Sequence, residues 1–156
     1  MQILVISDLH RRRSYFEKVL EKYPNINTVF FLGDGVDAAE EISSFYPQKN
    51  FHLLAGNCDF LSRYPSSGFF NLNGVKILAT HGHTYGVKGG TERLFTAAKN
   101  EGVSLALYGH THVQREEYRD GVHIVCPGAL DNYAEKPGYA IIDVTEKGIV
   151  VNLLRL

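Results

Sequence analysis

The chain has 156 residues, a formal net charge of −1, 44% hydrophobic residues and 21% charged residues. The length predicts a single domain covering residues 1–156, and the composition excludes a disordered or fibrous protein. A near-neutral charge provides no basic field, so we expect no strong binding of nucleic acids. The unusual feature is seven histidines against two cysteines and no tryptophan, because histidine serves in metal binding and proton transfer.

The two cysteines, Cys58 and Cys126, are too few for a disulfide framework and match no zinc-finger spacing, so we expect reduced thiols. The N-terminus leads directly into the apolar run Gln2–Ser7, without the charged region and cleavage site of a signal peptide. No apolar run approaches the roughly 18 residues that span a bilayer. The sequence therefore predicts a cytoplasmic protein with no membrane partner.

The first half of the chain alternates strand-like and helix-like segments. Ile3–Ile6 and Thr28–Leu32 are short continuous apolar runs, typical of strands that are buried on both faces, and Phe51–Ala55 is a third strand. Between them we expect two helices. Ser14-x-x-Glu17 is predicted to cap the first and Asp37-x-x-Glu40 the second.

The middle of the chain changes character. Asn73-Gly74 between Phe69–Leu72 and Val75–Thr80 is a strong hairpin signal, because a type I′ turn needs positive φ at both turn residues. A helix is predicted over Thr91–Asn100, and Leu105–Tyr108 is another buried strand.

The last third predicts antiparallel strands. Their ranges are Val113–Tyr118, Val122–Cys126, Gly138–Val144 and Ile149–Leu156. Strand–helix units followed by hairpins predict an α/β sandwich, in which two mixed sheets pack face to face with the helices outside.

Five apolar runs each end in a polar cluster. In chain order these clusters are Asp8-Leu9-His10, Gly33-Asp34-Gly35, Gly56-Asn57-Cys58-Asp59, His81-Gly82-His83 and Gly109-His110-Thr111-His112. In open α/β sheets, ligands bind beyond the carboxyl ends of the strands. We therefore expect the five clusters to meet at one rim of the sheets.

The clusters supply seven oxygen and imidazole donors. They are Asp8, His10, Asp34, Asn57, His81, His110 and His112. Such donors suit Mn, Fe, Zn or Ni, and seven are too many for one six-coordinate ion that must also hold water. Two ions that share one carboxylate fit better, and a pair roughly 3.5–4 Å apart can clamp both oxygens of a displacement at phosphorus. The sequence thus predicts phosphoester hydrolysis by a metal-bound hydroxide.

In this order the motifs resemble the signature of calcineurin-like metallophosphoesterases, and the chain length resembles the small bacterial and archaeal phosphodiesterases of that superfamily. The resemblance extends from Asp8 to His112. It implies a four-layer α-β-β-α sandwich that hydrolyses small phosphoesters, with phosphodiesters favoured. It also implies two divalent ions, with manganese favoured over iron, zinc or nickel.

The resemblance assigns a role to each donor. Asp8, His10 and His112 would hold one ion, whereas Asn57, His81 and His110 would hold the other. Asp34 would bridge both ions, and a bridging water or hydroxide would be the nucleophile. Asp34, Asn57 and His81 are accordingly the residues expected to be catalytic.

Two positions depart from the family pattern. Many relatives have a histidine at the position of Cys58, where it is thought to protonate the leaving group, so the general acid is left open. A thiol donates weakly, which favours good leaving groups. Ala129 occupies a position where related small enzymes often have serine. Asp59 is expected to orient a ligand from outside the metal shell.

Candidate substrate contacts are Cys58, His83 and Arg11, the first residue of an arginine run. Glycines 86, 89 and 90 lack the spacing of a phosphate-binding P-loop, so we interpret them as a loop near the site. Tyr85 and Tyr133 are weaker candidates for lining a substrate pocket.

Two other functions compete with a dinuclear hydrolase. One is a protein-interaction scaffold, because the small retromer subunit resembles this fold and has an incomplete metal site. Here no ligand position is substituted, which favours an enzyme. The other is a mononuclear zinc hydrolase, which would leave several donors unused. The C-terminal strands could also provide the surface of a homo-oligomer.

Overall fold

The computed structural model describes residues 1–131 and 136–156. Over these residues the chain forms two five-stranded sheets with three α-helices and one short 3-10 helix. In chain order the elements are β1 (Gln2–Ile6), α1 (Arg13–Lys22), β2 (Thr28–Phe31), α2 (Val36–Ser43), β3 (Asn50–Leu53), β4 (Ser67–Leu72), β5 (Val75–Thr80), η1 (His83–Tyr85), α3 (Glu92–Asn100), β6 (Leu105–Leu107), β7 (Arg115–Arg119), β8 (Val122–Cys126), β9 (Gly138–Thr145) and β10 (Gly148–Arg155).

The first sheet has the strand order β10-β9-β1-β2-β3. β1, β2 and β3 run parallel, and the antiparallel hairpin β9–β10 extends the sheet on the other side of β1. Because β1 lies in the middle and is covered on both faces, the continuous apolar run Ile3–Ile6 is fully buried, as its sequence predicts.

The second sheet has the order β4-β5-β6-β8-β7. Its centre, β6, pairs parallel with β5 and β8, whereas β4 and β7 are antiparallel edges. The two C-terminal hairpins therefore belong to different sheets, β7–β8 to the second and β9–β10 to the first. Sequence pattern alone did not distinguish these two destinations.

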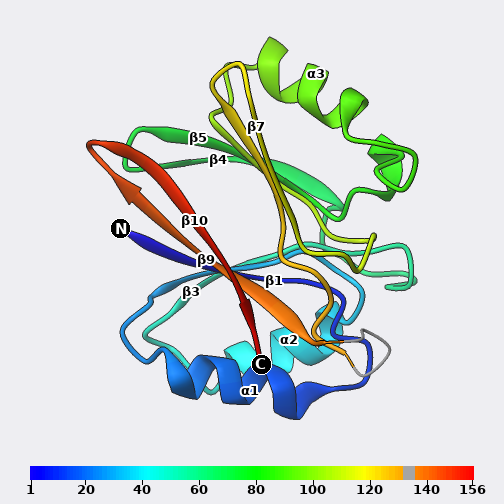
Figure 1. Cartoon of the computed structure of the whole chain (residues 1–156). Helices are drawn as coiled ribbons and strands as arrows, with labels where there is room; N and C mark the ends of the chain where they lie inside the picture. The colour runs from blue at the N-terminus through cyan, green and yellow to red at the C-terminus, as the bar shows by residue number, and fades with distance from the viewer. Residues whose placement is uncertain (132–135) are drawn as a thin grey trace.

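The elements stack in four layers, α-β-β-α, so the predicted fold class is confirmed (Figure 1). α1 and α2 cover the outer face of the first sheet through Phe16 and Ala39. α3 covers the second sheet through Leu94. Between the sheets, side chains such as Val5 and Leu107 form the central core. Each layer thus buries one apolar face against the next.

Both predicted helix caps are wrong. α1 begins at Arg13 with Arg12 at the N-cap, so Ser14 lies inside the first turn. α2 begins at Val36 with Gly35 at the N-cap, so Asp37 also lies within the helix. Arg12 makes no side-chain capping hydrogen bond, and Gly35 has no side chain with which to make one. At α2 a carboxylate from a distant loop, Asp59, accepts these bonds instead, which removes the need for a local cap.

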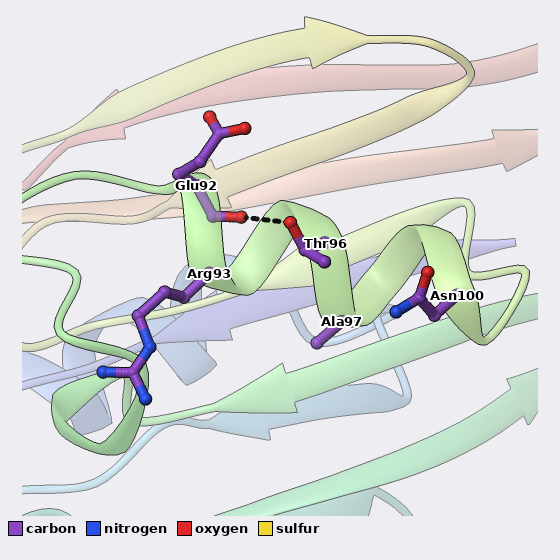
Figure 2. Close-up of a pocket in the computed structure, with 5 residues that line it drawn as sticks. All are labelled: Glu92, Arg93, Thr96, Ala97 and Asn100. Atoms are coloured by element: carbon purple, nitrogen blue, oxygen red, sulfur yellow. Dashed lines mark hydrogen bonds between the residues drawn. The ribbon is translucent and has the colours of Figure 1, made fainter.

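The outer face of α3 is exposed and carries a shallow hollow lined by Glu92, Arg93, Thr96, Ala97 and Asn100 (Figure 2). Thr96 Oγ1 donates to the Glu92 carbonyl at 2.9 Å, and Arg119 pairs with the Glu92 carboxylate. No helix in the described part of the chain is long and apolar enough to cross a membrane.

Candidate metal centre

Backbone hydrogen bonds draw the polar clusters together at one rim, beyond the carboxyl ends of β1, β2, β5 and β6. The Asp8 amide donates to the Gly33 carbonyl and the His10 amide to the Asp34 carbonyl, both at 2.9 Å. Between the loops of the second sheet, the Gly109 amide donates to the His81 carbonyl at 3.0 Å. The rim predicted from the strand ends is therefore formed.

Five of the seven candidate ligands have a left-handed backbone. Their φ angles are 54° at Asp8, 48° at His10, 59° at Asp34, 67° at His110 and 61° at His112. Non-glycine residues rarely adopt this conformation, and each instance costs of order 1–3 kcal/mol. Such a concentration persists only where the surrounding contacts determine the backbone, and it is typical of functional sites.

Two glycines allow the ligand loops to approach closely. A Cβ atom at Gly56 would lie 2.0 Å from Asp34 Oδ1. A Cβ atom at Gly109 would lie 1.9 Å from Ser7 Oγ and 2.9 Å from Asp8 Oδ2. Both glycines are therefore required by the space around the carboxylates.

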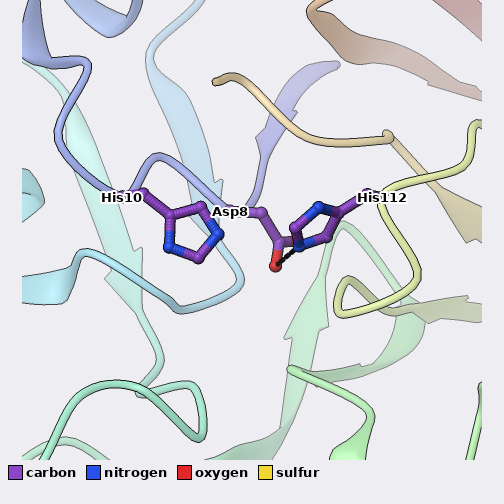
Figure 3. A group of neighbouring side chains, drawn as sticks. All are labelled: Asp8, His10 and His112. Atoms are coloured by element: carbon purple, nitrogen blue, oxygen red, sulfur yellow. Dashed lines mark ion pairs between the residues drawn. The ribbon is translucent and has the colours of Figure 1, made fainter. Parts of the chain in front are cut away.

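The first candidate group combines Asp8, His10 and His112, with the two imidazoles on either side of the carboxylate (Figure 3). His112 Nε2 lies 3.1 Å from Asp8 Oδ1 and pairs with it when the imidazole is protonated. This buried oxygen accepts no hydrogen bond from any described residue. Because a buried carboxylate oxygen without a donor is costly, Oδ1 is suited to bind a cation.

The other oxygen of Asp8 is fully occupied. Asp8 Oδ2 accepts hydrogen bonds from Ser7 Oγ at 2.6 Å and from the His110 amide at 3.0 Å. Burial acts to raise the pKa of Asp8, but His112, His81 and Ser7 together hold it below its usual value. The neighbouring Asp8 carboxylate in turn raises the pKa of His112.

The second candidate group combines Asp34, Asn57 and His81. His81 Nδ1 lies 2.7 Å from the Leu32 carbonyl, which can only accept, so this nitrogen is the donor. In the neutral ring Nε2 then carries a lone pair, which faces Asn57 Oδ1 at 3.0 Å and Asp34 Oδ2 at 3.6 Å. With the ring neutral, three acceptor atoms therefore converge, an arrangement that a cation satisfies.

The two remaining histidines of the rim lie beside His81. The ring centroid of His81 is 5.0 Å from that of His110 and 5.4 Å from that of His83. Burial lowers the pKa of both His83 and His110, and the charge of His81 lowers it further. His83 Nδ1 is buried and has no hydrogen-bond partner among the described residues. Both rings are thereby biased toward the neutral form that ligates metals.

Asp59 joins the loops that carry Asp34 and Asn57. Its Oδ2 accepts from the amides of Asp34 and Gly56 at 2.8 and 2.7 Å. Its Oδ1 accepts from the amides of Gly35 and Val36 at 2.8 and 3.1 Å. One carboxylate thus fixes the left-handed backbone at Asp34, so its orienting effect acts on the ligand's main chain rather than on its side chain.

Ser7 is a residue that the sequence interpretation missed. It is fully buried, and its hydroxyl orients the Asp8 carboxylate. A polar residue that ends a buried apolar strand and directly precedes a candidate ligand is a signal that could have identified it.

The candidate substrate contacts differ in position. Arg11 and Cys58 line a hollow of about 400 Å³ beside Asp34. The Cys58 thiol is exposed and groups with His10 and Asp34, and burial together with Asp34 raises its pKa. Tyr85 packs against the core under α3 instead of lining this hollow, and Tyr133 lies outside the described residues.

A four-layer sandwich whose strand ends gather carboxylate, amide and imidazole donors defines a metal-dependent hydrolase scaffold. The chain matches the model of the calcineurin-like phosphoesterase superfamily domain over residues 1–147, and it therefore belongs to that family. Membership supports metal-dependent hydrolysis of phosphoesters, with divalent cations as the cofactors.

Relatives of known sequence and structure agree with this assignment. A probable metallophosphoesterase of Bacillus subtilis, YsnB, is 24% identical over 155 residues, which cover 97% of this chain and 89% of the relative. The crystal structure of a protein from Streptococcus pneumoniae that is described as a predicted phosphoesterase is 26% identical, with a TM-score of 0.83. The match covers 99% of this chain and 88% of the other. The structure of an archaeal phosphodiesterase is 25% identical with a TM-score of 0.77, and the match covers 100% of both chains.

The same fold also occurs in Vps29. The structure of Entamoeba histolytica Vps29 in complex with Zn²⁺ is 19% identical with a TM-score of 0.78, covering 100% of this chain and 98% of that one. At this identity the match extends to the fold alone.

Proposed function

We propose that the protein hydrolyses phosphodiesters with two divalent cations bound at the rim of the sandwich. The observation that carries this proposal is the convergence of candidate ligand atoms at two positions of the rim. Asp8 Oδ1 accepts no hydrogen bond within the described part of the chain. At the second group, His81 Nε2 faces Asn57 Oδ1 and Asp34 Oδ2. Two separate convergences favour two cations over one.

The donors divide between two positions. Asp8, His10 and His112 would hold one cation, and Asn57, His81 and His110 would hold the other. Asp34 bridges them, an assignment supported by its place in two candidate groups, one with His10 and one with Asp8 and His81. Manganese fits the mixed oxygen and imidazole donors, and iron, zinc and nickel remain outcomes of the metal test below.

Divalent cations bound there would supply positive charge to the reacting phosphoester and would make water acidic enough to react near neutral pH. The protonation states of the chain's own residues near the cations matter as well. The pKa of His110 is lowered by burial, which keeps its ring available as a ligand. The pKa of the Cys58 thiol is raised by burial and by Asp34, so the thiol stays protonated and donates weakly. Esters with good leaving groups are accordingly the better substrates.

The preference for diesters is supported by one relative, the archaeal phosphodiesterase. The test compares bis(p-nitrophenyl) phosphate with p-nitrophenyl phosphate, using chelator-treated protein reloaded with manganese, iron, zinc or nickel. We expect turnover of the diester to be lost on chelation, to return with manganese, and to exceed turnover of the monoester.

Metal content per chain separates the dinuclear from the mononuclear arrangement, with two ions expected by elemental analysis. Asp37→Asn, an exposed acid beside the site, is the matched control and should retain turnover. If the reloaded protein hydrolyses no phosphoester with any of these metals, the proposal is wrong.

A scaffold role is the second candidate, favoured by two features. Vps29 shares the fold. Phe60 and Leu61, which follow the metal-side residues Cys58 and Asp59, are 86% and 105% exposed. An exposed apolar pair is a typical protein contact. Loss of a binding partner after Phe60→Ser and Leu61→Ser, together with a full absence of turnover in the unmodified protein, would favour the scaffold.

A further inference from the structure

A second hollow lies beside the loop that carries the candidate ligands His110 and His112. It has a volume of about 350 Å³, and its lining includes Lys88, Gly89, Gly90, Thr111 and Arg115. Thr111 stands between the candidate ligands His110 and His112, so the hollow is continuous with the metal-binding loop. Its size is at the lower end of ligand pockets in proteins.

The cations of this hollow are weakly compensated. Lys88 is exposed and pairs with no carboxylate among the residues described. The ion pair of Arg115 with Glu117 is long, at 3.6 Å, and Glu117 also accepts a hydrogen bond from Thr91 at 2.9 Å. The hollow therefore offers two positive charges to an incoming anion.

The loop before α3 presents open backbone to this space. Gly90 has a φ of 138°, and a Cβ atom added there would meet nothing within 4 Å. Arg93 adds a third cation beside the loop, because its Nη1 lies 3.8 Å from the Cβ position of Gly86. Figure 2 shows its guanidinium extended away from α3. The glycines noted in the sequence thus adjoin a set of cations, although they lack P-loop spacing.

The hollow on the Arg11 side has the opposite balance. There one arginine is accompanied by the carboxylates of Asp34, Asp37 and Asp59. Asp34 is neutralised by the cations that it is proposed to hold, but Asp37 and Asp59 still outnumber Arg11 in that hollow. An anionic group is therefore attracted more strongly by Lys88 and Arg115 in the second hollow. The two hollows therefore differ in charge.

From this polarity we infer that the Lys88–Arg115 hollow binds a second phosphate group of the substrate, while the phosphoester to be cleaved lies at the metal centre. The inference rests on the proposed function and narrows it to substrates with a phosphate besides the reacting one. Phosphorylated nucleotides are examples of that class.

The test uses two activated diesters that differ by one phosphate. They are thymidine 5′-(p-nitrophenyl phosphate) and its 3′-phosphorylated form, assayed with the manganese-loaded full chain. We expect the 3′-phosphate to lower KM about tenfold, as a charge-assisted contact would. Lys88→Ala should remove that advantage, so that the two diesters then have similar KM values.

Lys88→Arg should retain the advantage, because the charge is kept, and Arg115→Ala should reduce it. Lys147→Ala is the matched control, since Lys147 lies in the turn between β9 and β10 at the other end of the sandwich. The advantage should also shrink at high salt. Equal KM values for the two diesters in the unmodified protein, or an advantage that survives Lys88→Ala, would overturn the inference.

Calorimetry separates this inference from the proposed function. Thymidine 3′,5′-bisphosphate is titrated into the manganese-loaded protein and compared with thymidine 5′-phosphate. Tighter binding of the bisphosphate that Lys88→Ala abolishes, without turnover of either diester, would support the second phosphate site and contradict the hydrolase. Turnover of both diesters with equal binding of the two nucleotides would support the hydrolase and contradict the second phosphate site.

Discussion

The two ends of the sandwich use the same backbone conformation for different purposes. At the end remote from the metal centre, Asn73 and Asp120 have φ angles of 50° and 47°, and each precedes a glycine in a hairpin turn. At the other end, histidines such as His10 and His112 adopt similar angles without a following glycine. The first pair is determined locally by residue type, whereas the histidines are held by contacts from other loops.

This difference shows where the fold stores strain. Asn and Asp tolerate left-handed geometry because they hydrogen-bond locally, so the turn end is stable by itself. Histidine has no such advantage. The rim is therefore maintained by the tertiary hydrogen bonds around Asp8, Asp34 and Asp59, and it orients side chains for ligands that the turn end does not bind.

The largest expected effect comes from the carboxylate proposed to bridge the two cations. Asp34→Asn keeps the shape and the backbone but removes the charge, so manganese-dependent turnover of the activated diester should fall by more than about 100-fold. Steady-state kinetics and elemental analysis measure the loss. Asp37→Asn removes an equivalent charge nearby and should cost little. A variant that retains two ions and full turnover would exclude the bridging role.

Asp59→Asn should have the next largest effect. In the unmodified protein several backbone N–H groups donate to the Asp59 carboxylate, and the NH2 group of asparagine would place a donor against some of these donors. We expect manganese affinity to fall about 10- to 100-fold and the free energy of unfolding to fall by about 2 kcal/mol. Calorimetric metal titration and urea denaturation test the two effects separately. Unchanged metal affinity in a destabilised variant would limit Asp59 to capping α2.

The strain itself can be measured with paired substitutions. His10→Gly and His10→Ala both remove the imidazole, but glycine relieves the left-handed φ. The glycine variant should therefore be more stable by about 1 kcal/mol in metal-free protein. Asn73→Gly and Asn73→Ala provide the same comparison at the turn end. Equal denaturation midpoints for the His10 pair would mean that the rim carries no backbone strain.

The smallest effect is expected at Ser7. Ser7→Ala removes the 2.6 Å hydrogen bond to Asp8 Oδ2, while the His110 amide still contacts that oxygen. Metal affinity should weaken several-fold, equivalent to about 1 kcal/mol. Ser104→Ala is the control, because Ser104 precedes β6 at the end of the sandwich remote from the rim. An effect as large as that of Asp34→Asn would mean that Ser7 itself acts in the reaction.

Local patterns were sufficient where one segment decides the outcome. The Asn73-Gly74 hairpin, the buried β1 run and the polar clusters at the strand ends were all predicted from neighbouring residues. They failed at the helix starts, because the acceptor that caps α2 is supplied by Asp59 from the loop between β3 and β4. They also left open which sheet each C-terminal hairpin joins, since both have the same alternating pattern.

By itself, the sequence determined two features of this protein. They are the α/β sandwich architecture and the oxygen and imidazole donors at its strand ends. Donor type and strand periodicity are properties of short segments, so they can be recognised without coordinates. Only the tertiary structure decided that Asp8 Oδ1 accepts no hydrogen bond within the described part of the chain, and that His81 Nε2 faces Asn57 Oδ1. It also decided that Lys88 and Arg115 adjoin the loop of His110 and His112. These features depend on hydrogen bonds and charges from distant segments, and such contacts have no signature in the sequence of either segment alone.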